Sequence, residues 1–191
     1  MKTKQFRMLA LIVLVLIYST SAHTEDLRKY LSLSGYWKFS IGDDSKWASP
    51  LYDDAGWDQI TIPGQWENQG YNGYNGYAWY RKTFKLGEIP GKTPLYLMLG
   101  RIDDADEVYL NGKMLGKSGS FPPNFETAYN RTRKYTIPAG YLKENAENSI
   151  AIRVYDSYLE GGIVDGPTGL YFDADNELLS LKLYEYRHCV T

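Results

Sequence analysis

The sequence predicts an all-β fold, a sandwich of about eight or nine short strands. Apolar and polar residues alternate along several short runs, as they do on strands that bury one face. Glycine and tyrosine are abundant, with 18 residues each, and this composition suits strands joined by tight turns. No stretch gives a confident long helix. With 191 residues, the chain is long enough for one domain with a sizeable core.

The first 22 residues predict a secretory signal peptide that is not part of the fold. Basic residues precede an almost unbroken apolar run over residues 8–17, and small polar residues follow up to Ala22. The run is shorter than the roughly 20 apolar residues that span a bilayer. We therefore expect cleavage near Ala22, no membrane span in the mature chain, and a secreted or periplasmic protein. Residues 23–191 would form a single β-sandwich domain.

The charge argues against a nucleic-acid partner, and the cysteine content excludes an internal disulfide. The formal charge is −2, and removal of the basic start would make it more negative, so nucleic acid is not an expected partner. Cys189 is the only cysteine, so it cannot form an internal disulfide. The core must therefore be stable without covalent cross-links.

The first part of the domain predicts two strands after a lead-in. Residues 23–33 are expected to be a short helical or irregular segment. Residues 35–41 alternate, with Trp37 and Phe39 on the same face, which indicates a half-buried strand. Residues 59–62 form a short strand that ends at a Pro-Gly turn.

A long loop then interrupts the strand pattern. Over residues 65–77, glycine, tyrosine and asparagine recur without apolar periodicity, which indicates an irregular segment. A strand is predicted over residues 78–86. The continuous apolar run over residues 95–99 is typical of a central strand that is covered on both faces.

A hairpin is predicted around Asn111 and Gly112. Asn-Gly is the strongest short-range hairpin signal, because both central residues of a type I′ turn need φ > 0. The flanking residues 107–110 and 113–117 should pair, with alternate side chains on opposite faces. The other strands would build the sandwich around this hairpin.

The remaining part of the chain predicts three more strands and a second loop. Residues 133–137 and 149–155 have strand character, and the second of these alternates clearly. Residues 160–167 are rich in glycine and are expected to form a loop. Residues 177–186 would close the fold as a final strand.

The aromatic loop is the best candidate for a binding site. Sugars present apolar C–H faces that stack on aromatic rings, and hydroxyls that bond to amide side chains. We expect Tyr71 and Tyr74 to be exposed, and Trp79 and Tyr80 to lie in the core. Two alternatives stay open: Trp66 lies in the core, as large aromatic residues usually do, or the loop contacts a partner domain. The candidate carbohydrate-binding residues are Trp66, Tyr71, Asn72, Tyr74, Asn75 and Tyr77.

Several motifs carry a resemblance to a known family. In order, they are LSGYWKF at 33–39, DAGW at 54–57, IPGQW at 62–66, WYRKTF at 79–84, VYLNG at 108–112 and NSIAIRV at 148–154. The sequence resembles the N-terminal sugar-binding domain of glycoside hydrolase family two, the β-galactosidase and β-glucuronidase group. The motifs IDDADEVYLNG at 102–112, SGSFPP at 118–123 and GGIVDGP at 161–167 are similar to the version found in bacterial sialate O-acetylesterases.

The resemblance implies a galactose-binding-like β-sandwich, or jelly roll, that is not itself catalytic. It implies an exported module that binds carbohydrate or supports a carbohydrate-active enzyme. The alternative is a structural or protein-docking domain, or a fragment of a glycoside hydrolase or sialate O-acetylesterase whose catalytic domain is missing.

Catalytic groups are not expected in the chain itself. A hydrolase of this family needs two glutamates on a barrel of about 250 residues. The pair Asn176-Glu177 imitates part of that site but should begin the last strand. An esterase motif is broken at residues 42–45, and His188 lies close to the C-terminus, so a serine–histidine mechanism lacks a base.

We expect no cofactor, with a structural Ca²⁺ as the alternative that the resemblance keeps open, because such sandwiches often carry one. Calcium takes several hard oxygen ligands. Pairing of the carboxylates with arginine, or their solvation in turns, is the more conservative interpretation. The two weak candidate groups are Asp103, Asp104 and Asp106, and Asp173, Asp175 and Glu177.

Overall fold

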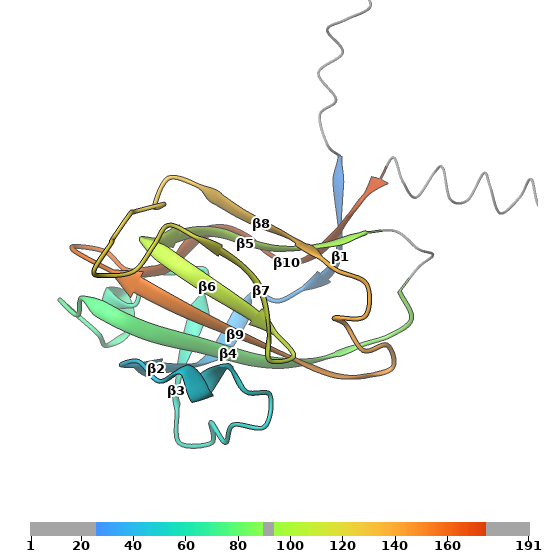
Figure 1. The fold of residues 1–191 in the computed structure, drawn as a ribbon, viewed down its shortest axis with the longest axis horizontal. Helices are drawn as coiled ribbons and strands as arrows, with labels where there is room; N and C mark the ends of the chain where they lie inside the picture. Colours follow the sequence, from blue (N-terminus) through green and yellow to red (C-terminus); the bar gives the residue numbers. More distant parts are fainter. Residues whose placement is uncertain (1–25, 90–93, 175–191) are drawn as a thin grey trace, which may run out of the picture.

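The computed structural model describes residues 26–89 and 94–174, which form two antiparallel sheets packed face to face (Figure 1). The predicted all-β sandwich is confirmed. The described residues contain ten strands and two short 3-10 helices, η1 (Ser45–Ala48) and η2 (Glu67–Gln69). The strands are β1 (Leu27–Ser32), β2 (Gly35–Ile41), β3 (Asp58–Ile62), β4 (Gly76–Leu86), β5 (Leu95–Asp103), β6 (Ala105–Leu110), β7 (Lys113–Ser118), β8 (Thr132–Ile137), β9 (Ala146–Asp156) and β10 (Gly162–Asp173).

The two sheets differ in size. The larger sheet has the strand order β3-β2-β4-β9-β6-β7, and the smaller sheet has the order β1-β10-β5-β8. Figure 1 shows the smaller sheet above the larger one. The longest pairing joins β4 to β9, with Gly76 opposite Asp156 at one end and Leu86 opposite Ala146 at the other. β4 and β9 therefore form the centre of the larger sheet.

The hydrophobic core lies between the sheets. Trp37 and Phe39 of β2 and Tyr80 of β4 are at most 1% exposed, which confirms the predicted alternation in residues 35–41. The rings of Phe39 and Tyr80 meet edge to face, with centroids 4.9 Å apart. Leu97 and Leu99 of β5 meet them from the smaller sheet and are fully buried.

The predicted hairpin is confirmed. Asn111 and Gly112 have φ of 52° and 78°, and β6 and β7 pair on either side of them. The Asn111 amide donates to the carbonyl of Tyr141 and to Asn148 Oδ1, so the turn is also tied to neighbouring segments. A Cβ at Gly112 would lie 2.8 Å from Cδ of Pro50, so this position requires glycine for space as well as for backbone conformation.

Five other predicted strands are confirmed as β3, β4, β5, β8 and β9. Each begins earlier or ends later than its prediction, because the pairing between strands continues beyond the residues that alternate or form an apolar run. β5 lies between β10 and β8 in the smaller sheet, as expected for a central strand.

Two segments that were predicted to be irregular form strands instead. The described part of the segment 23–33 is not a helical or irregular lead-in, because it forms β1, which pairs with β10. The segment 160–167 is mostly not a loop, because β10 begins at Gly162. The register shift between Asp165 and Thr168 accommodates Gly166 and Pro167, so pairing with β5 continues past residues that usually end a strand.

Other predictions fall outside the described residues. These are the signal peptide over residues 1–22, the final strand over residues 177–186, and the positions of His188 and Cys189. Among the residues that are described, no helix has the length and apolar character needed to cross a membrane.

Candidate functional site

The aromatic loop between β3 and β4 folds back onto the core. Trp66 is fully buried, and its Nε1 donates to the carbonyl of Tyr74 at 3.2 Å. Gly161, after β9, lies directly on the indole, because a Cβ there would come within 2.2 Å of a ring atom. Trp66 therefore anchors the loop as a core residue, which was the alternative interpretation.

Tyr71 and Tyr74 are half-buried, so the expectation that both are exposed is wrong. The Tyr71 ring meets Phe39 edge to face at 4.7 Å, and its hydroxyl donates to Asp58 Oδ2. The Tyr74 hydroxyl donates to the carbonyl of Tyr77 at 2.6 Å. Burial raises the pKa of both phenols, and the Asp58 carboxylate raises that of Tyr71 further. Both rings support the loop, because burying a large ring removes apolar surface from water.

A Tyr71→Ala/Tyr74→Ala variant should lose at least about 2 kcal/mol of unfolding free energy. Each ring contact contributes about 0.5–1.5 kcal/mol beyond area burial, and each hydrogen bond about 1 kcal/mol. Urea unfolding followed by tryptophan fluorescence measures the loss. The matched control is Asn72→Ala/Asn75→Ala, on the exposed part of the same loop, which should unfold with the parent. A tyrosine variant as stable as the parent would restore the original expectation.

Tyr77 belongs to an aromatic group on the outer face of the larger sheet. Ala78 faces the core, so strand alternation directs Tyr77 to the other side. The Tyr77 ring centroid is 4.8 Å from that of Tyr155 on β9 and 5.5 Å from that of Phe121. Phe125 is 36% exposed and lies 5.3 Å from Tyr155. We call Tyr77, Phe121, Phe125 and Tyr155 the aromatic patch.

Charged groups border the aromatic patch. The Arg153 guanidinium carbon lies 4.6 Å from the ring centroid of Tyr77 and 4.3 Å from that of Phe121. Arg153 also donates to both oxygens of Asp43, at 2.8 and 2.5 Å, and to Glu107 at 3.3 Å. Aromatic surface and oriented polar groups therefore lie side by side, a combination typical of sugar-binding sites.

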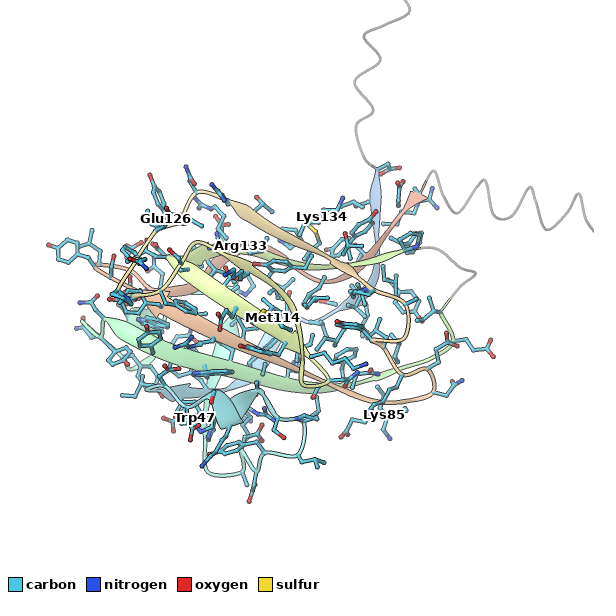
Figure 2. All side chains as sticks on the ribbon, in the orientation of Figure 1. Trp47, Lys85, Met114, Glu126, Arg133 and Lys134 are labelled. Carbon is cyan, nitrogen blue, oxygen red and sulfur yellow. The ribbon has the colours of Figure 1, made fainter. Side chains whose placement is uncertain are left out.

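The rest of this outer face carries a covering layer. Trp79 is buried as predicted, but it lies under η1 rather than between the sheets. Its ring centroid is 6.1 Å from that of Trp47, which in turn is 5.0 Å from that of Trp57. Figure 2 shows Trp47 on the side of the larger sheet away from the smaller one. Arg81 extends into this layer and donates to Asp54 at 2.7 Å.

Sequence reasoning identified Tyr77 and missed the rest of the patch. Tyr155 lies opposite Tyr77 in the β4–β9 ladder, although the two are far apart in the sequence. The alternation of Arg153 and Tyr155 with buried residues was a usable signal for two outward side chains on β9. Phe121 gave no such signal, because it belongs to an irregular segment after β7.

Asp103, Asp104 and Asp106 do not form one cluster. Asp106 is fully buried and accepts from Arg133 Nε at 2.7 Å, and the Arg133 side chain is also fully buried. Asp103 and Asp104 instead meet Asp156 at the end of β9. One carboxylate oxygen from each of these three residues lies within 4.8 Å of the other two. We call Asp103, Asp104 and Asp156 the acidic cluster.

The acidic cluster has perturbed protonation. Burial, together with a hydrogen bond to Asp104, raises the pKa of Asp103 to about 7. Burial and the nearby Asp104 charge raise the pKa of Asp156 to about 6. Burial also opposes ionisation of Asp104, but hydrogen bonds from Ser157 and Thr127 lower its pKa overall. The geometry therefore concentrates carboxylates where negative charge is poorly tolerated.

The other predicted groups have no site in the described residues. Asp173 ends β10, while Asp175 and Glu177 lie outside the described ranges. Within the broken esterase motif, Asp44 Oδ1 accepts from the Lys46 backbone at 2.9 Å and caps η1. That contact gives Asp44 a structural role.

Comparison with known proteins gives the family. A family model described as the β-galactosidase second all-β domain matches residues 42–158. The chain belongs to this family. The matched residues include the aromatic patch and the acidic cluster. The resemblance to glycoside hydrolase family two is therefore confirmed, whereas the narrower resemblance to sialate O-acetylesterases stays a prediction.

Relatives of this β-galactosidase second all-β domain are much longer proteins. A putative β-glucuronidase from Formosa agariphila is 28% identical over 160 residues, which cover 78% of this chain and 14% of that protein. A β-galactosidase from Priestia megaterium is 26% identical over 156 residues, which cover 66% of this chain and 14% of that protein. The chain thus spans about 14% of the length of these relatives.

Solved structures share the fold. The crystal structure of a Bacteroides uniformis β-glucuronidase superposes with a TM-score of 0.61 at 22% identity, covering 77% of this chain and 18% of that one. A Lactobacillus rhamnosus β-glucuronidase superposes with a TM-score of 0.54 at 17% identity, covering 70% of this chain and 22% of that one. At these identities the superpositions support the fold alone.

Proposed function

We propose that this chain is an exported, non-catalytic domain that binds carbohydrate through the aromatic patch. The observation that supports the proposal most is the group of four contacting rings on the outer face of the larger sheet, bordered by Arg153. Family membership adds a context of glycoside hydrolases. The expected ligand is a glycan, with neither nucleic acid nor a membrane as partner.

The chemistry of the patch fits a sugar. The rings of Phe121 and Phe125, beside that of Tyr155, offer apolar surface to the C–H face of a pyranose. Arg153, Asp43 and Glu107 supply donors and acceptors of fixed direction for hydroxyl groups. Because these three side chains are already bonded to one another, little conformational entropy is lost when a ligand binds.

A glycan array followed by calorimetry tests the proposal. The parent should bind members of a panel that includes β-galactosides, β-glucuronides and host-type glycans. A Phe121→Ala/Phe125→Ala variant should lose about tenfold or more in affinity, because two stacking contacts contribute about 0.5–1.5 kcal/mol each.

Mass spectrometry of the exported protein should find an N-terminus near His23, and an intact Met1 form would contradict export.

The matched control removes an exposed ring elsewhere. Tyr36 of β2 is 70% exposed and lies outside the patch, so Tyr36→Ala should bind like the parent. If the parent binds no glycan, the carbohydrate proposal fails. If it binds and the double phenylalanine variant binds equally well, the site lies elsewhere on the domain.

Docking onto a carbohydrate-active enzyme is the second candidate function. Tyr158 and Leu159, just after β9, are 71% and 65% exposed. Large side chains that expose apolar surface to solvent favour a protein contact. Absence of glycan binding, combined with comigration of the chain and a glycoside hydrolase in gel filtration, would favour this function over the first.

A further inference from the structure

The dipeptide Asn-Gly occurs three times in the chain, at 72–73, 75–76 and 111–112. In this dipeptide the backbone nitrogen of glycine can attack the side-chain amide carbon of asparagine, because glycine has no Cβ to hinder the approach. The reaction needs an amide side chain that is free to turn, a following peptide bond that can rotate, and access of water. The fold provides these conditions to different degrees at the three positions.

Asn72 and Gly73 form the tip of the aromatic loop. The backbone N–H of Tyr74 donates to the carbonyl of Tyr71 at 3.0 Å, so Asn72 and Gly73 are the two central residues of a turn. Both are exposed, and the side chain of Asn72 has no hydrogen-bond partner among the described residues. Gly73 has φ of 72°, and a Cβ there would have nothing within 4 Å apart from its chain neighbours. Both reacting groups are therefore open to water.

The turn leaves its central peptide free to rotate. Tyr71 and Tyr74 hold the two ends, because their rings pack against the core and their hydroxyls are hydrogen-bonded. Type I and type II turns differ by rotation of the peptide between the two central residues, and this rotation leaves the ends in place. Together with rotation of the side chain, it can bring the Gly73 nitrogen to the amide carbon of Asn72. The anchored ends therefore do not block the reaction at the tip.

Asn75 has the same neighbours in the sequence as Asn72 but less freedom. Each asparagine lies within a Tyr-Asn-Gly-Tyr sequence, so the local sequence gives the two equal reactivity. Gly76, however, begins β4 and lies opposite Asp156 in the ladder with β9. A Cβ at Gly76 would also lie 3.3 Å from the hydroxyl oxygen of Tyr74. Rotation of the peptide after Asn75 would therefore displace the end of a strand.

Asn111 is held at both polar atoms of its side chain. Its Nδ2 donates to the Tyr141 carbonyl at 2.7 Å and to Asn148 Oδ1 at 2.8 Å, and its Oδ1 accepts from the Ser149 backbone at 3.0 Å. These three hydrogen bonds must break before the Gly112 nitrogen can reach the amide carbon. The reaction should therefore be about a hundredfold slower here than at a free side chain.

We propose that Asn72 is a site of spontaneous deamidation, and that the fold protects Asn111 from the same reaction. The nitrogen of Gly73 forms a bond to the amide carbon of Asn72, and the bond from that carbon to Nδ2 breaks. Ammonia leaves with the proton of the Gly73 N–H, and a cyclic imide remains. Water then opens the imide at either carbonyl, which gives aspartate or isoaspartate. Each product places one negative charge at the tip of the loop.

The two products should affect the loop differently. The side chain of Asn72 is exposed, so a chain with aspartate at position 72 should unfold with the parent. Isoaspartate adds one atom to the main chain between Tyr71 and Tyr74, both of which pack against the core. It should therefore loosen the loop that holds Trp66 through the carbonyl of Tyr74. The deamidation proposal holds whether or not the aromatic patch binds a glycan.

Peptide mapping of aged protein tests the proposal. The folded protein is incubated at mildly alkaline pH and body temperature, digested, and mapped by mass spectrometry with fragmentation that separates aspartate from isoaspartate. Asn72 should be converted first, Asn75 more slowly and Asn111 least, with at least about a tenfold difference between the first and the last. Ion-exchange chromatography should show an acidic variant that grows at the same rate as conversion of Asn72.

Two controls separate the effect of the fold from that of the local sequence. In guanidinium chloride, where the fold is lost, Asn72 and Asn75 should react at the same rate, and Asn111 should lose its protection. Asn72→Gln keeps an exposed amide, but its cyclisation needs a larger ring, so the acidic variant should largely disappear. Asn130→Gln is the matched variant, since Asn130 is exposed but is followed by arginine, and it should form the acidic variant like the parent.

Three results would overturn the proposal. The first is an intact Asn72 in the folded protein over a time in which the denatured chain reacts. The second is an equal rate at Asn72 and Asn111 in the folded protein, which would mean that the hydrogen bonds of Asn111 give no protection. The third is an undiminished acidic variant in Asn72→Gln, which would place the reaction at another residue.

Discussion

An Arg133→Met variant should lose about 3–5 kcal/mol of unfolding free energy, because it leaves a buried carboxylate without its countercharge. Arg133 and Asp106 are both fully buried, and Nε lies 2.7 Å from Oδ1. The guanidinium also donates to the carbonyls of Ala128, Arg131 and Asp104, all of which lose a partner. Figure 2 labels Arg133 at the position where β8 faces the larger sheet. Urea unfolding followed by tryptophan fluorescence gives the free energy.

Two further variants sharpen this measurement. Arg101→Met removes an arginine of the same length whose ion pair with Asp165 is half-exposed, and it should unfold with the parent. Arg133→Met/Asp106→Leu removes both buried charges and should recover part of the loss, because no uncompensated charge remains. A single Arg133→Met variant with the denaturant midpoint of the parent would mean that Asp106 has another way to lose its charge.

A Trp37→Ala variant should lose about 3–5 kcal/mol of unfolding free energy, as buried aromatic residues do when a cavity replaces them. The Trp37 side chain is 1% exposed, and its Nε1 donates to the carbonyl of Leu33 at 2.7 Å. The substitution therefore opens a large cavity between the sheets and leaves the carbonyl without its partner. Thermal unfolding by circular dichroism, together with urea unfolding, measures the effect.

The adjacent residue supplies the control. Tyr36→Ala changes a residue of the same strand that is 70% exposed, so it should melt with the parent. Trp37→Phe should be milder than Trp37→Ala, because the smaller cavity costs less. Equal midpoints for Trp37→Ala and the parent would show that the core between the sheets does not depend on this residue.

The fold places the two candidate sites at related positions. Tyr155 and Asp156 are consecutive at the end of β9, so their side chains point to opposite faces of the larger sheet. Tyr155 joins the aromatic patch on the outer face, and Asp156 joins the acidic cluster on the inner side. A change at the end of β9 should therefore affect both.

The sequence by itself determined most of the secondary structure and the family. Alternation in residues 35–41 and 149–155 predicted strands, because a strand that buries one face needs apolar residues at every second position. The pair Asn111 and Gly112 predicted the hairpin turn that it forms, because few residues adopt φ > 0 easily. These signals are local, and each depends on residues within a few positions of one another.

Only the tertiary structure decided which side chains meet. Alternation states which face of a strand a residue occupies, but not which strand lies beside it. The contact of Tyr77 with Tyr155 follows from the pairing of β4 with β9. The proximity of Asp103 to Asp156 arises where the chain passes from the smaller sheet to the larger one between β5 and β6. Trp66 has no alternating pattern around it, so its burial depends on the close approach of Gly161. The strand ladder and the packing of loops onto it, which no local pattern encodes, therefore build both candidate sites.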